Sequence, residues 1–288
     1  MLRQRSISAV GIVLFAAIPA FIGGIVFAAA MLVITLISIH ELLTAYRTTG
    51  YRPFRKSALV AGALFVLVGV FEPPASSLPW LITGFLLVSL LIPMARKTID
   101  GALIDWALTF SAVMYVAVPL MFAIALRKSD GDSSQHWSNV VAGWFGSPGR
   151  GLALVGIVFA VTWLNDTAAY LAGRKFGKTK LIPSISPGKT RVGAIAGVFA
   201  GTLAGALAAW IFGAPFNVFV AGGLGCLLAI AGQLGDLAES LIKRNLGIKD
   251  MGNLIPGHGG MLDRIDALLF TFPVTFMLAA LLTRIGWM

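Results

Sequence analysis

The 288-residue chain has little charge, one cysteine and three histidines. Charged residues make up only 12% of it and hydrophobic residues 58%, with a mean hydropathy of +0.89, unlike a soluble globular domain. Cys226 has no partner in the sequence, which excludes an intramolecular disulfide and a cysteine-ligated metal site. The composition therefore predicts a membrane protein whose fold is held by packed helices.

Apolar segments long enough to cross a bilayer follow one another along the chain. The stretch from Ile7 to Leu43 is too long for one crossing, and Pro19, Gly23 and Gly24 divide it into two. Together with the later segments, it predicts an all-α polytopic bundle of about nine transmembrane helices. The later predicted spans are 57–71, 79–94, 102–126, 152–173, 192–212, 216–242 and 264–282.

Lysine and arginine are concentrated in alternate loops, whereas the loops FEPPASSLP and FGAPFN contain neither. Such residues accumulate on the cytoplasmic side of a membrane, so the N-terminus and residues 235–266 are predicted to be cytoplasmic and the C-terminus outside. Basic loops beside anionic lipid also account for the net charge of +10, and no nucleic-acid partner is expected. The basic loop residues are Arg3, Arg5, Arg47, Arg52, Arg55, Lys56, Arg96, Lys97, Arg174, Lys175, Lys178, Lys180, Lys189 and Arg191.

Polar residues inside the predicted spans are concentrated in the C-terminal half. Residues 1–150 are therefore expected to form a scaffold and any oligomer contacts, and residues 151–288 the catalytic helices and their loops. Glu41, which follows His40 near the end of the second predicted span, is expected to lie at the membrane interface. The chemistry of the protein is assigned to the second half.

A polar stripe marks the predicted span 216–242 and its continuation. Gly232, Asp236, Glu239, Ser240 and Lys243 recur at intervals of three and four, which places them on one face of a helix. A charged side chain at the centre of a membrane helix costs about 2.5–3.5 kcal/mol on insertion scales. The stripe therefore indicates a functional surface.

Acidic residues on two other helices can face the same cavity. Asp166, beside Asn165, lies in the span 152–173, while Asp263 and Asp266 open the last span. Together with Asp236 they offer carboxylates from three helices, with no cluster of histidine or cysteine nearby. Such a set suits a hard cation such as Mg²⁺, which takes a few carboxylates and substrate phosphates.

A glycine-rich loop precedes the last predicted helix. Glycines at 257, 259 and 260 let the backbone turn tightly and approach a ligand, and free amides at a helix N-terminus attract anions. Five cationic or titratable residues surround this loop: Lys243, Arg244, Lys249, His258 and Arg264. With the acidic residues, they predict a metal–phosphate site that handles a nucleoside triphosphate.

Each of these residues also has a simpler interpretation. Lys243 and Arg244 could be basic residues that extend from a helix end toward the membrane interface. Asp263 could cap a helix, Asp250 could be a solvated loop charge and His258 could be a turn residue. The sequence alone leaves these alternatives open.

Two motifs resemble one known family. Residues 240–266 read S-x-x-K-R-x-x-x-x-K-D-x-G-x-x-x-P-G-H-G-G-x-x-D-R-x-D, which is similar to the signature of phosphatidate cytidylyltransferases, also called CDP-diacylglycerol synthases. Residues 165–178 fit the family pattern N-D-x-x-A-Y-x-x-G-R-x-F-G-K, and residues 186–190 fit S-P-x-K-T. The chain departs from the family at Gly188, where lysine is usual, and at Arg191 and Val192, where tryptophan and glutamate are common.

The resemblance implies transfer of a cytidylyl group from CTP to phosphatidic acid, a step of phospholipid biosynthesis in the bacterial inner membrane. It implies Mg²⁺, as two divalent ions or with a second, monovalent cation. Asp236, Asp263 and Asp166 would hold metal, and Asp236, Asp263, Lys243 and Asp266 would be catalytic. The predicted substrate-binding residues are Asn165, Asp166, Arg174, Ser186, Lys189, Thr190, Ser240, Arg244, Lys249, His258, Gly259, Gly260 and Arg264. From the fold class we expect a homodimer embedded in lipid.

The sequence also bears on three other functions. A transporter would also carry intramembrane carboxylates, but its substrate site would lie near the bilayer midplane and not in a loop. A CDP-alcohol phosphotransferase would need a D-G-x-x-A-R motif, which neither Asp100-Gly101 nor Asp130-Gly131 begins. A CTP-dependent polyprenol or dolichol kinase is the nearer alternative, and it differs in using a hydroxyl acceptor.

Overall fold

The computed structural model describes residues 15–71, 73–96, 98–129, 149–212, 214, 217–254 and 259–287. Its helices are α2 (Gly24–Thr48), α3 (Arg55–Phe71), α4 (Pro74–Leu91), η1 (Pro93–Ala95), α5 (Ala102–Arg127), α6 (Arg150–Phe176), α7 (Arg191–Ile211), α8 (Val218–Asn245), α9 (Leu262–Ile265) and α10 (Leu268–Arg284). Within the described residues, seven helical segments are long and apolar enough to cross a membrane, with α4–η1 and α9–α10 each taken as one segment. The predicted all-α polytopic bundle is confirmed, and the chain is an integral membrane protein.

The predicted division of the first apolar stretch is also confirmed. Gly23 and Gly24 have positive φ angles of 73° and 51°, which favour glycine, and α2 begins there. Residues 15–22 before the break are helical, while the rest of the predicted first span lies outside the described residues. At 17 residues, α3 lies near the lower limit for a bilayer crossing and matches the predicted span 57–71.

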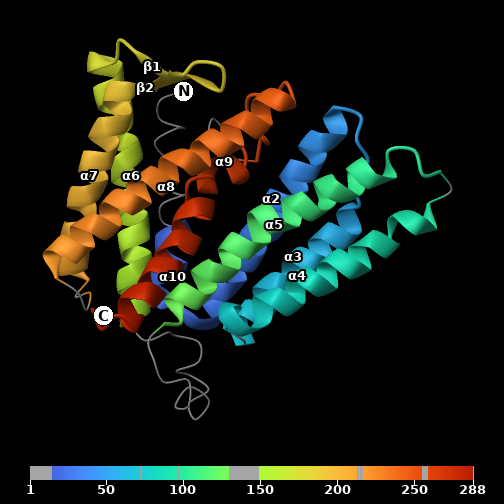
Figure 1. The fold of residues 1–288 in the computed structure, drawn as a ribbon, viewed down its shortest axis with the longest axis horizontal. Coiled ribbons are helices and arrows are strands. Elements are labelled where there is room, and N and C mark those ends of the chain that lie inside the picture. Colours follow the sequence, from blue (N-terminus) through green and yellow to red (C-terminus); the bar gives the residue numbers. More distant parts are fainter. Residues whose placement is uncertain are drawn as a thin grey trace.

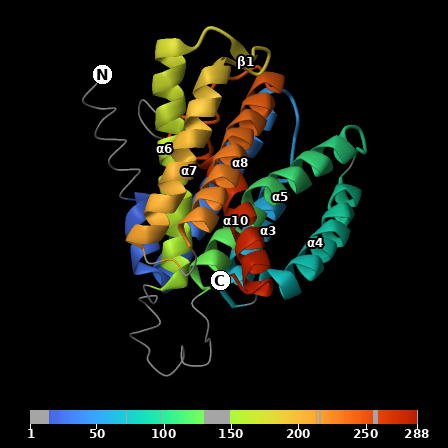
Figure 2. The ribbon, with the colours of Figure 1, turned by 60° about the vertical axis from the view of Figure 1, so that its left-hand side comes forward.

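Two groups of helices make up the bundle (Figure 1). Helices α6, α7 and α8 pack against one another on one side, and α2, α3 and α5 on the other. Helix α10 lies between the groups and contacts α5, α6 and α8. Helix α4 packs against α3 and α5 and stands apart from α6–α8 in the rotated view of Figure 2.

A glycine stripe lets α7 approach both of its neighbours. Gly193, Gly197, Gly201 and Gly205 recur every fourth residue, and all four are buried. A Cβ added to Gly205 would lie 2.7 Å from the backbone of Gly225 on α8. Small residues at such spacing allow close helix contact in membranes, where van der Waals packing replaces much of the hydrophobic driving force. The stripe therefore sets the spacing of the α6–α7–α8 group.

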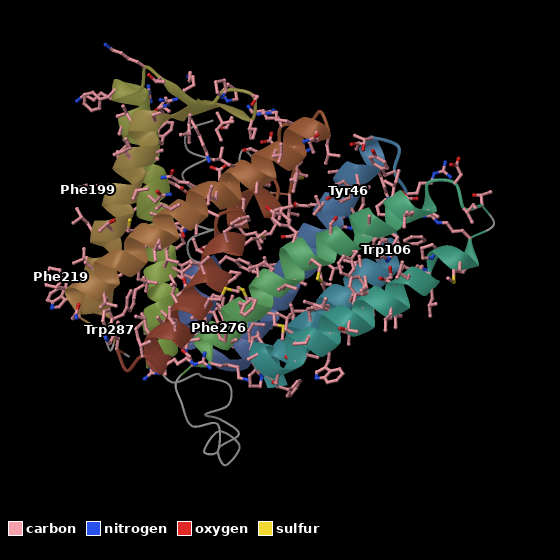
Figure 3. The ribbon with its side chains drawn as sticks, in the orientation of Figure 1. Tyr46, Trp106, Phe199, Phe219, Phe276 and Trp287 are labelled. Atoms are coloured by element: carbon pink, nitrogen blue, oxygen red, sulfur yellow. The ribbon has the colours of Figure 1, made fainter. Side chains whose placement is uncertain are left out.

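Large apolar side chains cover the outside of the bundle. Phe199 on α7 is 66% exposed and Phe219 on α8 is 87% exposed, and Figure 3 shows both pointing away from the helices. Phe276 of α10 instead packs on Phe122 of α5, with ring centroids 5.1 Å apart. An apolar exterior of this kind suits contact with lipid.

One end of the bundle carries the β-hairpin, formed by the antiparallel strands β1 (Lys180–Ile182) and β2 (Ser186–Thr190). We call this end of the molecule the hairpin end. The C-terminal ends of α2, α6 and α8 and the start of α7 lie there in Figure 1. It therefore brings together the basic loops that follow α2 and α6 and the polar end of α8.

Candidate active site

The hairpin places Lys189 against the polar face of α8. Its Nζ lies 2.7 Å from Oδ2 of Asp236 and 3.5 Å from the backbone oxygen of Gln233. Both side chains of the ion pair remain partly exposed, at 24% for Lys189 and 35% for Asp236, so a ligand can reach them. The structure thus places Lys189, a predicted substrate-binding residue, beside Asp236, a predicted metal ligand.

The other predicted residues of the hairpin have different environments. Thr190 is buried, and its Oγ1 accepts a hydrogen bond from the backbone N–H of Gly193 at 3.1 Å, so it caps α7. Ser186 is half-buried and pairs with Ile182 in the register of the two strands. The hydroxyl of Thr190 is therefore committed to holding the hairpin on α7.

An amide network joins three helices beside this ion pair. Asn165 of α6 is fully buried, and its Nδ2 donates to Oδ1 of Asp166 at 3.0 Å. Gln233 of α8 donates from Nε2 to Oδ1 of Asn165 at 2.8 Å and to the backbone oxygen of Ala194 at 2.9 Å. Asp166 itself is exposed. The network thus fixes Asp166 relative to α7 and α8.

A buried charge cluster lies one turn further along α8. Lys243 pairs with Glu239 at 2.5 Å and with Oδ1 of Asp263 at 2.7 Å, and the side chains of the two acids are 0% and 2% exposed. Oδ2 of Asp263 accepts the backbone N–H groups of Met251 and Gly260 at 2.9 and 2.8 Å. Buried carboxylates need such partners because burial removes their hydration. Asp263 therefore fastens the loop before α9 to α8.

Further predicted residues surround the cluster. Ser240 donates to Oδ1 of Asp236 at 3.3 Å, and the half-buried Asp266 accepts the N–H of Ala267 at 2.8 Å. Arg244 donates to the backbone oxygen of Ile185 at 3.2 Å and so ties α8 to the hairpin. Arg174 donates to the hydroxyl of Tyr170 at 3.3 Å. Four of the side chains are exposed at the hairpin end: Arg174, Arg244, Lys249 and Arg264.

The glycine-rich loop is only partly described. His258, together with Pro256 and Gly257, lies outside the described residues. Gly259 has a φ of 81°, and a Cβ there would lie 2.8 Å from Oδ2 of Asp263. The positive φ angle and the lack of room for a Cβ atom both favour glycine at position 259. The glycines of this loop were predicted to let the backbone approach a ligand closely. At Gly259 and Gly260, the backbone lies close to the carboxylate of Asp263.

The family model that describes the cytidylyltransferase family matches residues 3–282 of the chain. The chain belongs to the cytidylyltransferase family. It is 31% identical over 290 residues to a phosphatidate cytidylyltransferase of Synechocystis sp., covering 98% of each chain. It is also 36% identical over 170 residues to a phosphatidate cytidylyltransferase of Staphylococcus aureus, covering 59% of this chain and 57% of that one. The resemblance inferred from the two motifs is confirmed.

Glu41, near the end of α2, is buried within the protein, at 7% exposure. Its Oε1 and Oε2 accept the backbone N–H groups of Met261 and Leu262 at 3.0 and 2.9 Å, so it satisfies donors at the start of α9. Helix α2, within residues 1–150, therefore supplies a carboxylate that holds the loop before α9.

Two polar residues of α8 were not assigned to the site from the sequence. Gln233 precedes Asp236 by three residues, a spacing that places both on one face. The sequence places Glu239 on the polar stripe without indicating a role for it, and in the structure its Oε1 is buried without a hydrogen-bond partner among the described residues. The three-residue spacing of Gln233 and Glu239 from Asp236 is the sequence feature that could have assigned them to the site.

The described residues fit a magnesium ion that completes its coordination with substrate. No group of three or more histidine, cysteine or acidic residues within the described parts of the chain is arranged to hold a metal by itself. Mg²⁺ needs only one or two carboxylates besides water and phosphate. Asp236 and Asp166 are accessible and close enough to interact electrostatically, and the unpartnered oxygen of Glu239 offers another donor. Both carboxylate oxygens of Asp263 already accept hydrogen bonds from protein groups.

Proposed function

We propose that this protein transfers the cytidylyl group of CTP to phosphatidic acid and releases pyrophosphate. The observation that carries the proposal is the 2.7 Å pairing of Lys189 with Asp236, which brings the hairpin onto the polar face of α8. Family membership and the full-length similarity to a phosphatidate cytidylyltransferase support this substrate pair.

The reaction requires two polyanions to meet. An oxygen of the phosphatidate phosphate attacks the α-phosphorus of CTP, the new P–O bond forms, and the bond to the β-phosphate oxygen breaks. The attacking oxygen is already anionic, so no strong base is required. Stabilising the charge on the transferred and leaving phosphates is therefore the main task.

The exposed cations at the hairpin end suit that task. Lys189, Arg244 and Arg264 are accessible from this end and would hold substrate phosphates, with Arg174 and Lys249 at its margin. Lys243, whose side chain is 12% exposed, lies between Glu239 and Asp263, so it would act from inside the cluster. Ser240, Gly259, Gly260 and the loop residues Ser186 and His258 belong to the same proposed substrate site.

Asp236 and Asp166 would hold the magnesium ion, and Asn165 would keep Asp166 in place through its 3.0 Å hydrogen bond. When bound, the ion neutralises phosphate charge that protein cations alone leave uncompensated. Asp263 stays a predicted ligand, although Oδ1 becomes available only if Lys243 moves away from it. Asp266 is proposed to support the same carboxylate group, with which it interacts electrostatically.

The site is proposed to face the cytoplasm in a bacterial inner membrane. The basic loops after α2 and α6 and the basic end of α8 all lie at the hairpin end, as the positive-inside rule requires for a cytoplasmic side. We further propose a homodimer, which a mass measurement of the detergent-solubilised protein would test.

Reaction of purified protein with CTP, phosphatidic acid and Mg²⁺ tests the proposed function. Pyrophosphate release should require both substrates and should stop when a chelator removes the metal. Turnover with a polyprenol in place of phosphatidic acid would instead support the kinase, and absence of any Mg²⁺-dependent lipid product would exclude both enzymes.

A further inference from the structure

Two acidic residues of the candidate site, Asp236 and Asp263, each lie against a lysine. Nζ of Lys189 is 2.7 Å from Oδ2 of Asp236, and Nζ of Lys243 is 2.7 Å from Oδ1 of Asp263. Both acids are predicted metal ligands, and a lysine ammonium and a metal cation are attracted to the same carboxylate oxygens. Each lysine therefore competes with a cation for its acid.

The two ion pairs differ in burial. The side chains of Lys189 and Asp236 are 24% and 35% exposed, whereas those of Lys243 and Asp263 are 12% and 2% exposed. Water screens a partly exposed pair, while breaking a buried pair leaves an uncompensated charge in the interior. Lys243 is also held from a second side by Glu239, at 2.5 Å. The Lys189–Asp236 pair is therefore the one that opens at low cost.

The backbone that carries Lys189 is held near both ends of its strand. Thr190, the next residue, accepts the N–H of Gly193 through Oγ1 at 3.1 Å and caps α7. Arg244 donates to the backbone oxygen of Ile185, just before β2, at 3.2 Å. Opening the pair therefore requires rotation of the flexible Lys189 side chain and not movement of the hairpin.

Asp236 belongs to a group of acids whose charge Lys189 partly offsets. Asp166 interacts electrostatically with both Asp236 and Lys189, and Asp266 interacts with Asp236 and Glu239. Neighbouring carboxylates repel one another, and the group attracts cations. Lys189 supplies a compensating positive charge while it pairs with Asp236, so it opposes the entry of a free divalent cation.

We propose that Lys189 exchanges partners during substrate binding, from the carboxylate of Asp236 to a phosphate of CTP, and so frees Asp236 for Mg²⁺ when the nucleotide is present. The inference rests on the proposed function and adds to it an order of events at the site. A lysine ammonium has three donors and can pair with a carboxylate or a phosphate oxygen. Because coupling between two ligands is reciprocal, metal and nucleotide should each strengthen the binding of the other.

Lys189→Met tests the exchange because it removes the ammonium group and keeps an unbranched side chain. Binding of Mn²⁺, a paramagnetic substitute for Mg²⁺, would be followed without nucleotide by loss of the free-ion EPR signal. Lys189→Met should bind Mn²⁺ about fivefold or more tightly than wild type, as for a weakly coupled pair of sites. Lys180→Met is the matched control, because Lys180 is an exposed lysine of β1 and its substitution removes the same charge from the same hairpin. Its Mn²⁺ affinity should equal that of wild type.

Chemical modification of wild-type protein provides a measurement that does not depend on the variant's folding. An amine-reactive reagent would be added, and the modification rate of Lys189 relative to Lys180 would be measured by mass spectrometry. Excess Mg²⁺ without nucleotide should raise this rate, because Lys189 then leaves Asp236. Mg²⁺ with CTP should lower it, because a phosphate then holds the ammonium group.

Three results would overturn the exchange. These are a Mn²⁺ affinity of Lys189→Met equal to or below that of wild type, an equal gain in Lys180→Met, and a modification rate that responds to neither addition. A different result would contradict the proposed function alone: Lys189 responds to Mg²⁺ and CTP as expected, but the wild-type protein forms no lipid product from CTP and phosphatidic acid.

Discussion

Nε2 of Gln233 donates a hydrogen bond to Oδ1 of Asn165 at 2.8 Å, across the interface between α8 and α6. The same nitrogen donates to the backbone oxygen of Ala194 on α7. Since Asn165 in turn donates to Asp166, one glutamine sets the position of a proposed metal ligand on another helix. Asp166 thereby has a fixed place beside the Lys189–Asp236 pair.

Gln233→Ala should lower kcat more than it raises the KM for either substrate. Loss of the amide leaves a buried acceptor of Asn165 unpaired, which costs about 1–3 kcal/mol, and frees Asp166 to move. Kinetics and thermal unfolding measured together test this expectation. Asn245→Ala is the control, because Asn245 is an exposed amide of α8 that donates within its own helix, at 2.9 Å to the backbone oxygen of Leu241. Equal kcat in the two variants would contradict the positioning role.

Gly197→Ala should disturb the same network from α7. The added Cβ would lie 2.6 Å from Oδ1 of Asn165 and 2.9 Å from Nε2 of Gln233, so the helices or the amides must move. We expect a lower unfolding temperature and reduced turnover. Gly223→Ala, at a helical position with nothing within 4 Å of the new Cβ, should unfold at the same or a higher temperature. Indistinguishable unfolding curves would show that α7 does not constrain the network.

Asp263→Asn should abolish most turnover while the protein remains folded. The substitution removes the charge that pairs with Lys243 at 2.7 Å and leaves Lys243 with Glu239 alone. Asp105→Asn is the matched control, since Asp105 is also a buried acid, paired at 2.6 Å with Arg96 on the α4–α5 side. Both variants should lose stability, but only Asp263→Asn should lose activity. Near-wild-type turnover of Asp263→Asn would remove Asp263 from the site.

Glu41→Ala should weaken catalysis although Glu41 lies outside residues 151–288, which are predicted to be catalytic. Its loss leaves the N–H groups of Met261 and Leu262 without their acceptor and loosens the start of α9. Glu41→Gln keeps one acceptor oxygen and should recover part of the loss. Faster hydrogen exchange at residues 259–265 in Glu41→Ala would report the loosening directly, and unchanged exchange there would contradict it.

The sequence predicted the fold class and the shared face of the polar residues on α8, because both depend on local periodicity. Apolar runs give the spans, and three- and four-residue spacing places Asp236 and Lys243 on one face of α8. It did not predict which charges pair, since Lys189 and Asp236 meet only through the folded hairpin. Glu41 was missed because its partner Met261 lies 220 residues away.

Asp263, a predicted metal ligand, illustrates the same limit of prediction from local sequence. As a sequence position, Asp263 opens a helix and could be a ligand or a cap. In the folded protein its two oxygens accept hydrogen bonds from Lys243, Met251 and Gly260. Local spacing cannot reveal such competition between partners, because those partners come from α8 and from two parts of the loop.

CTP labelled separately at the α- and γ-phosphates tests the proposed reaction most directly. Purified wild-type protein would be incubated with phosphatidic acid, Mg²⁺ and each labelled nucleotide, and the lipid fraction would be counted. Cytidylyl transfer predicts that the α-label enters the lipid while the γ-label leaves as pyrophosphate. Entry of the γ-label into lipid, or of neither label, would contradict the account.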